Sequence, residues 1–351
     1  MRILNIKNNL VPSVQVRESN MEILRLIATF LIIIIHSNFL SLGWPKVEDF
    51  ICNPTATWLR TFFESLGIIG VNCFIFISGW FGIKLKIKGL FNLLFQCGYF
   101  YIFIAVIFYL IGLTSFEFSH MKRFIFVDDW FIVSYLLLMI LSPVLNTFVD
   151  NISRTIFRNI LILYYIFAFT YGTFSGFSAF NGGYTTIFFV GYYLLIRYIR
   201  LYKPRFASKP IWFDFMIYLL TSILLCLLYR YQVPVLGQFT YLNPLVIISS
   251  VSFSLIFTKF SYKNKIINWF ASSAFSIYLL HGVPGIIEPF KNMFKQLFST
   301  YSTLEFWVLD FIIIISIALV AILLDQPRKK IFNYIMNIKI IKKITSKVIC
   351  S

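Results

Sequence analysis

Three residues of one apolar segment have the types and the spacing for chemistry inside a membrane. The segment NMEILRLIATFLIIIIHSN, residues 20–38, carries Glu22 and Arg25 near its start and His36 near its end. At about 100° per residue, Arg25 and His36 are roughly three helical turns plus about 20° apart, so both leave one face of a helix. Along the axis they stand about 16 Å apart, half of a hydrocarbon core of roughly 30 Å. Ionisable residues at such depths are costly and indicate a functional site.

A second histidine falls at a matching depth. His281 lies in SSAFSIYLLHGVP, and both histidines are about fifteen residues from the predicted inner ends of their helices. A neutral imidazole accepts a hydroxyl proton near neutral pH, which suits a general base or the partner of one. The alternative is that each histidine only bonds a neighbouring helix.

Glu22 and Arg25 are three residues apart, so they are neighbours on one helical face and can form an ion pair. In the functional interpretation Arg25 faces a polar passage and binds an anionic ligand. The alternative is a snorkelling anchor at the end of the helix.

Further polar residues have both structural and functional interpretations. Asn72 and Ser78 in GVNCFIFISGWFGIK could contact a substrate, although small residues also serve close helix packing. Asp128 and Asp129 lie near His120, but a metal site needs three or more converging ligands. We therefore expect a helix cap there, and no metal site.

Composition identifies the class of protein. Of 351 residues 59% are hydrophobic and only 13% are charged, which indicates a polytopic membrane protein. The formal charge of +17 could suggest nucleic acid, but the basic residues occupy short loops between apolar runs. We expect no nucleic-acid partner, because such binding needs a basic patch on a soluble face.

Apolar runs predict an all-α bundle of about ten transmembrane helices. The runs cover residues 23–43, 66–83, 90–113, 130–149, 159–174, 183–200, 211–230, 241–258, 268–287 and 305–325. Most lysines and arginines fall in the loops on one side, which places both termini in the cytoplasm. The chain divides into a cytoplasmic segment 1–20, a membrane domain 21–327 and a basic cytoplasmic tail 328–351.

Short motifs in order along the chain resemble those of acyltransferase family 3, integral membrane enzymes that O-acylate extracytoplasmic sugars. They are the Arg-x10-His spacing with an acidic residue three before the arginine, FISGW, WFIVSYLLLMILSP, GYYL, SIYLLH and DQPRKK. The resemblance covers nearly the whole chain and implies ten spans. It also implies an acyl-CoA donor bound from the cytoplasm, with His36 and Arg25 essential.

Two departures from the family pattern bear on function. Many members carry Arg-x-x-Arg near the start of the third span, where this chain has Lys84, Lys86 and Lys88 instead. No esterase-like domain follows the tenth run, so we expect transfer to finish within the membrane part or on a glycan-assembly protein.

The sequence thus predicts an O-acyltransferase, with acetyl as the expected group, of the bacterial plasma membrane. It would use acyl-CoA as cosubstrate, with no bound cofactor, and a surface polysaccharide or lipid-linked saccharide as acceptor. Expected site residues are catalytic His36, Arg25 and Glu22, substrate-binding His281, Tyr278, Ser78 and Asn72, and donor-binding Arg25, Lys84, Lys86 and Lys88. His36 would take the hydroxyl proton or be acylated first, Glu22 would orient Arg25, and His281 would orient the acceptor or support His36. A transporter, flippase or polymerase of lipid-linked saccharides is the alternative.

Overall fold

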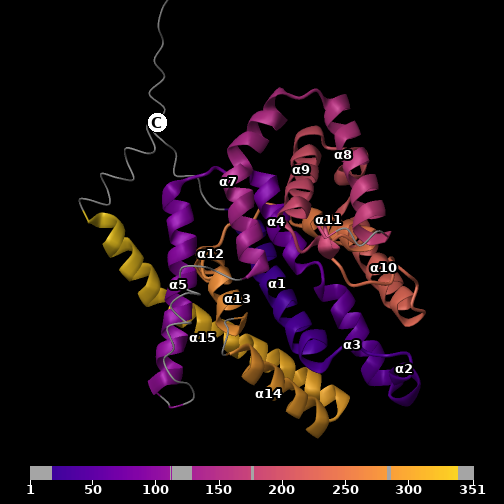
Figure 1. Ribbon diagram of the computed structural model, residues 1–351, viewed down its shortest axis with the longest axis vertical. Helices are drawn as coiled ribbons and strands as arrows, with labels where there is room; N and C mark the ends of the chain where they lie inside the picture. The colour runs from indigo at the N-terminus through magenta and orange to yellow at the C-terminus, as the bar shows by residue number, and fades with distance from the viewer. Residues whose placement is uncertain (1–17, 111, 113–128, 175–177, 283–285, 339–351) are drawn as a thin grey trace, which may run out of the picture.

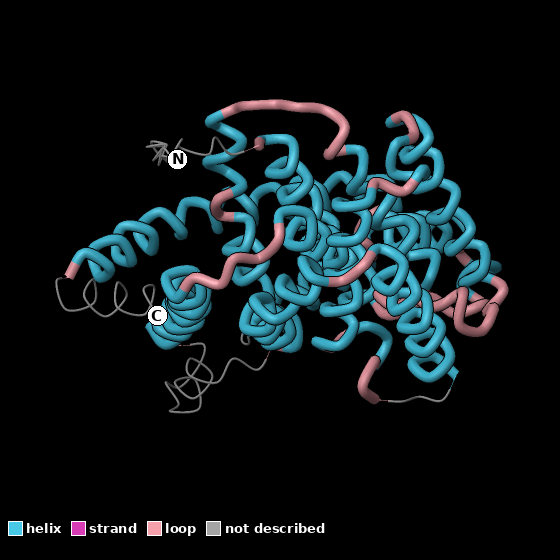
Figure 2. The backbone as a smooth tube through the Cα atoms, turned by 90° about the horizontal axis from the view of Figure 1, so that it is seen from above, coloured by secondary structure: helices cyan, strands magenta, loops and turns pink. Residues whose placement is uncertain are grey.

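The computed structural model describes the chain except for residues 1–17, 111, 113–128, 175–177, 283–285 and 339–351. The described residues form helices and loops without a strand, which confirms the predicted all-α class (Figure 2). The α-helices are α1 (Ser19–Ile35), α2 (Asp49–Cys52), α3 (Pro54–Gly67), α4 (Gly70–Phe81), α5 (Ile87–Leu110), α7 (Trp130–Asn151), α8 (Arg154–Phe169), α9 (Thr186–Tyr202), α10 (Ile211–Arg230), α11 (Pro244–Ile256), α12 (Lys265–Ala271), α13 (Ala274–Gly282), α14 (Ile287–Thr300) and α15 (Thr303–Asn337). Short π or 3₁₀ segments are η1 (His36–Leu40), η2 (Thr170–Phe174), η3 (Asn181–Gly183) and η4 (Arg205–Ser208).

Helix α1 occupies the centre of the bundle (Figure 1). It packs against α3, α4, α12 and α13, so most of its apolar side chains are buried. Gly70 makes the contact with α4 close: a Cβ at that position would lie 2.7 Å from Ile32 Cγ1 and 2.9 Å from the Ala28 carbonyl oxygen. The helix that carries Arg25 and His36 is therefore held from several sides.

Among the described residues, seven helices are long and apolar enough to cross a membrane, or eight if the bent pair of α12–α13 with α14 is one span. The described chain is therefore a multi-pass membrane protein, and the count of ten stays a prediction because α9 and α11 are short. The orientation with both termini in the cytoplasm also stays a prediction. Hydrogen bonds do join helix ends that this orientation puts on one side: Asn20 Nδ2 donates to the Phe257 carbonyl oxygen over 2.6 Å, and Asn146 Nδ2 to that of Ile83 over 2.8 Å.

Three predicted boundaries differ from the structure. The second span is Pro54–Phe81 rather than 66–83, because the polar residues of α3 find partners inside the protein and need no water. The ninth apolar run ends in a bend of 80° between α13 and α14. The last helix continues through Pro327 to Asn337, beyond the predicted end at residue 325.

Candidate active site

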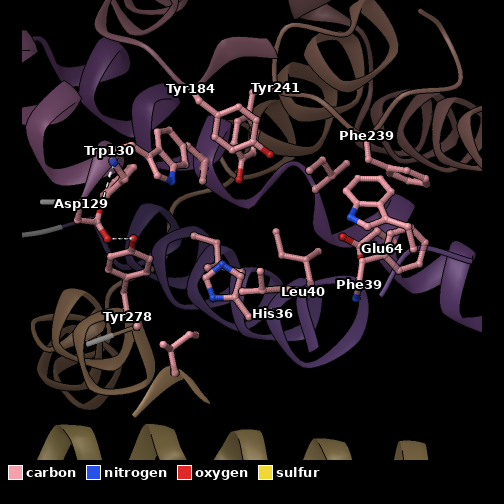
Figure 3. Close-up of a pocket in the computed structure, with 18 residues that line it drawn as sticks. His36, Phe39, Leu40, Glu64, Asp129, Trp130, Tyr184, Phe239, Tyr241 and Tyr278 are labelled. Carbon is pink, nitrogen blue, oxygen red and sulfur yellow. Dashed lines mark hydrogen bonds between the residues drawn. The ribbon is translucent and has the colours of Figure 1, made fainter. Parts of the chain in front are cut away.

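Two cavities lie along the polar face of α1. The first, the His36 cavity, has a volume of about 290 Å³ and is lined by residues of α1, η1, α3 and α7 and of the loops around η3 and before α11 (Figure 3). The second, the Arg25 cavity, has a volume of about 220 Å³ and lies among α1, α5, α7 and α12. Phe131 lines both cavities, so its side chain forms part of the wall of each.

His36 and His281 form a direct pair at the wall of the first cavity. His36 Nδ1 lies 2.9 Å from His281 Nε2, and His281 Nδ1 lies 2.8 Å from the carbonyl oxygen of Ile277. Because a carbonyl oxygen only accepts, Nδ1 of His281 must carry the proton. If both rings are neutral, Nε2 of His281 has no proton and therefore accepts a hydrogen bond from Nδ1 of His36. This assignment leaves a lone pair on His36 Nε2, on the ring that lines the cavity. The pair can therefore supply a general base.

A π-helical turn presents His36 to the cavity. The segment η1 begins at His36, where the Ser41 hydroxyl donates to the His36 carbonyl oxygen over 2.6 Å. Asn38 Nδ2 donates to the carbonyl oxygen of Arg60 over 2.7 Å and to Glu64 Oε2 over 2.9 Å. Ser41 therefore satisfies a backbone carbonyl of the turn, Glu64 accepts from the backbone N–H of Phe39 within it, and Asn38 holds the turn against α3. Such turns occur often at functional sites.

Carboxylates and tyrosine hydroxyls supply the other polar groups of the His36 cavity. Asp129 caps α7 by accepting from the backbone N–H of Phe131 and Ile132, as the sequence predicted. Its second oxygen accepts from the Tyr278 hydroxyl over 2.7 Å (Figure 3). Glu64 lines the same cavity and was not predicted. The sequence did offer a signal: residues 55–66 contain no glycine or proline, and Arg60 and Glu64 are four residues apart, as on one face of a helix.

Arg25 lines the second cavity and is paired as expected. Its NH1 donates to Glu22 Oε2 over 2.6 Å, and Glu22 is almost completely buried. Lys84, Lys86 and Lys88 are not among the described residues that line this cavity. Sequence reasoning missed Lys329, a cation that contacts this lining by donating to the Ser272 hydroxyl over 2.7 Å.

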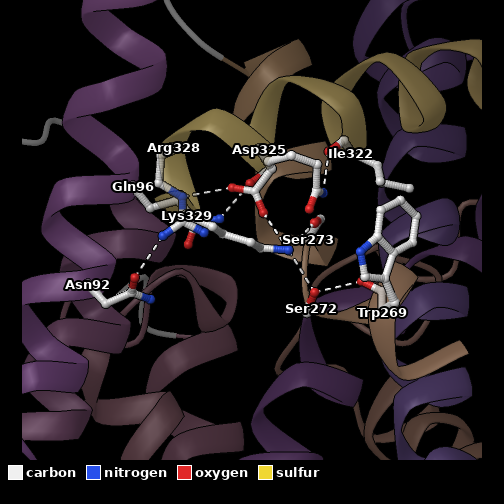
Figure 4. Close-up of polar contacts among 11 residues, drawn as sticks. Asn92, Gln96, Trp269, Ser272, Ser273, Ile322, Asp325, Arg328 and Lys329 are labelled. Carbon is white, nitrogen blue, oxygen red and sulfur yellow. Dashed lines mark hydrogen bonds and ion pairs between the residues drawn. The ribbon is translucent and has the colours of Figure 1, made fainter. Parts of the chain in front are cut away.

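Lys329 belongs to a buried polar cluster between α5, α12–α13 and α15 (Figure 4). Asp325 accepts from Arg328 Nε over 2.8 Å and pairs with Lys329 Nζ over 3.0 Å. Arg328 NH1 donates to Asn92 Oδ1 over 2.7 Å. The DQPRKK motif therefore ties the last helix to the walls of the Arg25 cavity.

The predicted substrate-binding residues separate into two groups. Tyr278 lines the His36 cavity, and His281 lies behind His36 with its side chain buried. Asn72 and Ser78 line neither cavity: Asn72 donates to the carbonyl oxygen of Tyr241 over 3.3 Å, and the Ser78 hydroxyl lies 2.9 Å from that of Tyr135. Their contacts are those of helix packing.

The described residues contain no group of three or more His, Cys, Asp or Glu side chains that could hold a metal ion. Asp128 and His120, considered above for such a site, lie outside the described residues.

A family model described as an acyltransferase domain matches residues 18–325. No curated protein and no solved structure matches the chain. The matched range begins just before α1 and ends in α15, and it contains the lining of both cavities.

Proposed function

The chain belongs to acyltransferase family 3, and from that premise we propose that it moves an acyl group, with acetyl expected, from acyl-CoA to a hydroxyl of a surface polysaccharide or lipid-linked saccharide. It is a membrane acyltransferase; the donor, the acceptor and a place in the bacterial plasma membrane are parts of the proposal.

The donor would bind along α1. Phosphates would lie beside Arg25, whose guanidinium is held by Glu22, and the thioester would lie beside His36. The two side chains line cavities that share Phe131, so a thin linear arm on this path passes that ring. Lys84, Lys86 and Lys88 would attract the phosphates at the entry, since Coulomb attraction acts over several ångströms without direct contact.

His36 would act through Nε2. In direct transfer this nitrogen takes the proton of the acceptor hydroxyl while the hydroxyl oxygen bonds to the thioester carbon. The carbon–sulfur bond then breaks, and the leaving thiolate takes the proton back from His36. In the alternative sequence Nε2 itself attacks first and carries the acyl group. In both, His281 holds the Nδ1 proton so that the lone pair stays on Nε2.

The observation that carries the proposal is the histidine pair at the cavity wall, with the free nitrogen of His36 on the side away from its partner. This order of hydrogen bonds is the one that a general base needs, because it keeps a lone pair on the ring nitrogen of His36 that is turned away from His281.

The test uses the purified protein in vesicles with radiolabelled acetyl-CoA and a saccharide acceptor. Wild type is expected to label the acceptor, and His36→Ala to lose labelling while remaining folded. Arg25→Ala is expected to raise the KM for the donor, with Arg158→Ala as a control on exposed α8. Labelling by His36→Ala at the wild-type rate, or saccharide movement without any need for acyl-CoA, would overturn the proposal.

A further inference from the structure

Aromatic rings form much of the wall of the His36 cavity. Trp130 stacks on Tyr241 with ring centroids 5.5 Å apart and meets Tyr184 edge-on at 4.7 Å. The ring centroids of Trp44 and Phe239, which also line the cavity, are 6.1 Å apart. Such rings offer apolar area to the C–H face of a sugar while their polar tips remain available to hydroxyls. At about 290 Å³ the cavity is near the small end of ligand pockets, which suits one sugar unit.

Among the described residues that line the cavity, the acidic side chains are Asp129 and Glu64. Asp129 accepts from two backbone N–H groups and one tyrosine hydroxyl, and because every partner is a donor, these contacts favour the carboxylate. It also stands at the N-terminus of α7, where the helix dipole favours an anion. Glu64 Oε2 accepts from Asn38 and from the backbone N–H of Phe39, the latter over 3.4 Å, so Asp129 is the acidic group on which the charge argument rests. No lysine or arginine is among the described residues that line the cavity.

Among the described residues, Arg60 and Lys291 are cations close to this wall, and each is bonded to another partner. Arg60 Nε donates to Asn38 Oδ1 over 3.1 Å, and its NH2 donates to the carbonyl oxygen of Gly43. Lys291 on α14, close enough to act electrostatically on His36, donates to Glu288 over 2.8 Å. An anionic group inside the cavity would therefore face Asp129, with no lysine or arginine among the described lining residues to receive it.

From this wall we infer that the sugar unit bound in the His36 cavity is uncharged or carries an amine, and that units with a carboxylate or phosphate are rejected. The inference rests on the proposed acyl transfer and adds the class of acceptor that the site takes. Two like charges about 6 Å apart at an effective dielectric constant of about 20 repel by enough to lower kcat/KM roughly a hundredfold. Asp129 is thus a specificity-determining residue.

The experiment compares matched alkyl glycosides: a glucoside with the corresponding glucuronide, and a galactoside with the galacturonide. The methyl ester of each uronide keeps the shape of the carboxylate without its charge. Binding is followed by tryptophan fluorescence in the inactive His36→Ala protein, because Trp44 and Trp130 line the cavity. Transfer from acetyl-CoA is followed in the wild type. Binding is thereby measured separately from the chemistry.

Neutral glycosides and methyl esters are expected to bind and react, and uronides to be weaker by roughly a hundredfold. Asp129→Asn keeps a capping side chain, and it should narrow the ratio of kcat/KM between each neutral glycoside and its uronide at least tenfold. Asp150→Asn, an exposed carboxylate near the other end of α7, should not change this ratio. Uronides that match their neutral partners, or failure of every glycoside to quench fluorescence, would overturn the inference. Selective binding without transfer would leave it standing and refute the proposed function.

Discussion

Replacement of His281 by phenylalanine removes the group that accepts the Nδ1 proton of His36. The imidazole of His281 is 1% exposed and packs against the Phe290 and Tyr278 rings, so a phenyl ring of similar shape fits the same space. His36 Nδ1 then loses its partner at 2.9 Å. A donor left unpaired in a buried place costs about 1–3 kcal/mol, so His36 would turn or exchange tautomers. We expect kcat to fall about 5- to 150-fold.

The assay is the initial rate of acetyl transfer in vesicles over a range of acceptor concentrations. Because His281 does not line the cavity, the acceptor KM should change little. His281→Gln serves as the matched control, since its amide oxygen can accept from Nδ1 and should restore part of the rate. The double variant with His36→Ala should be no slower than His36→Ala alone, because His281 acts through His36.

Two results would refute this reasoning. One is a His281→Phe protein with the wild-type kcat. The other is a change confined to the acceptor KM, which would assign His281 to substrate binding instead of to the support of His36.

Phe131 lines both cavities, so the larger ring of Phe131→Trp should slow transfer at least tenfold, while a filter assay should still show donor binding. A wild-type rate of transfer would exclude a donor path beside this ring. Asp325→Asn leaves Arg328 buried beside a neutral partner and should lower the free energy of unfolding by about 3–5 kcal/mol. The measurement is thermal unfolding in detergent, and an unchanged midpoint would contradict the ion-pair account. Gly79→Ala puts a Cβ 2.8 Å from a side chain of α9 and should lower the free energy of unfolding by about 1–3 kcal/mol in the same measurement. In the control Gly89→Ala the new Cβ meets nothing within 4 Å, so the free energy should not fall. Equal effects of the two variants would contradict the packing argument.

The sequence predicted the histidine pair only in part. Matched depth on two helices of the same direction placed His36 and His281 at one level, since helical rise is regular. Their contact depends on how α13 packs against α1. At the π turn, the contact of Ser41 with the His36 carbonyl oxygen is local, whereas the partner of Asn38, the Arg60 carbonyl oxygen, is brought close only by the packing of α3.

Glu64 and the end of α15 were missed for a related reason. Hydropathy treats polar residues as exposed, so most of α3 fell between the predicted runs 23–43 and 66–83, and residues 328–351 were interpreted as a tail. In the structure Glu64 accepts from Asn38, and Arg328 is buried against Asp325 and Asn92. Buried polar groups are tolerated when they are paired, and the partners come from distant segments of the sequence.

The most direct test of the central claim is the O-acetyl content of the surface glycan, measured by NMR. Cells that lack this protein are compared with the same cells complemented with wild type or with His36→Ala. The account predicts that one acetyl signal disappears in the deletion and returns only with wild type. A glycan that keeps every acyl group in the absence of the protein, while its export or chain length changes, would contradict the account.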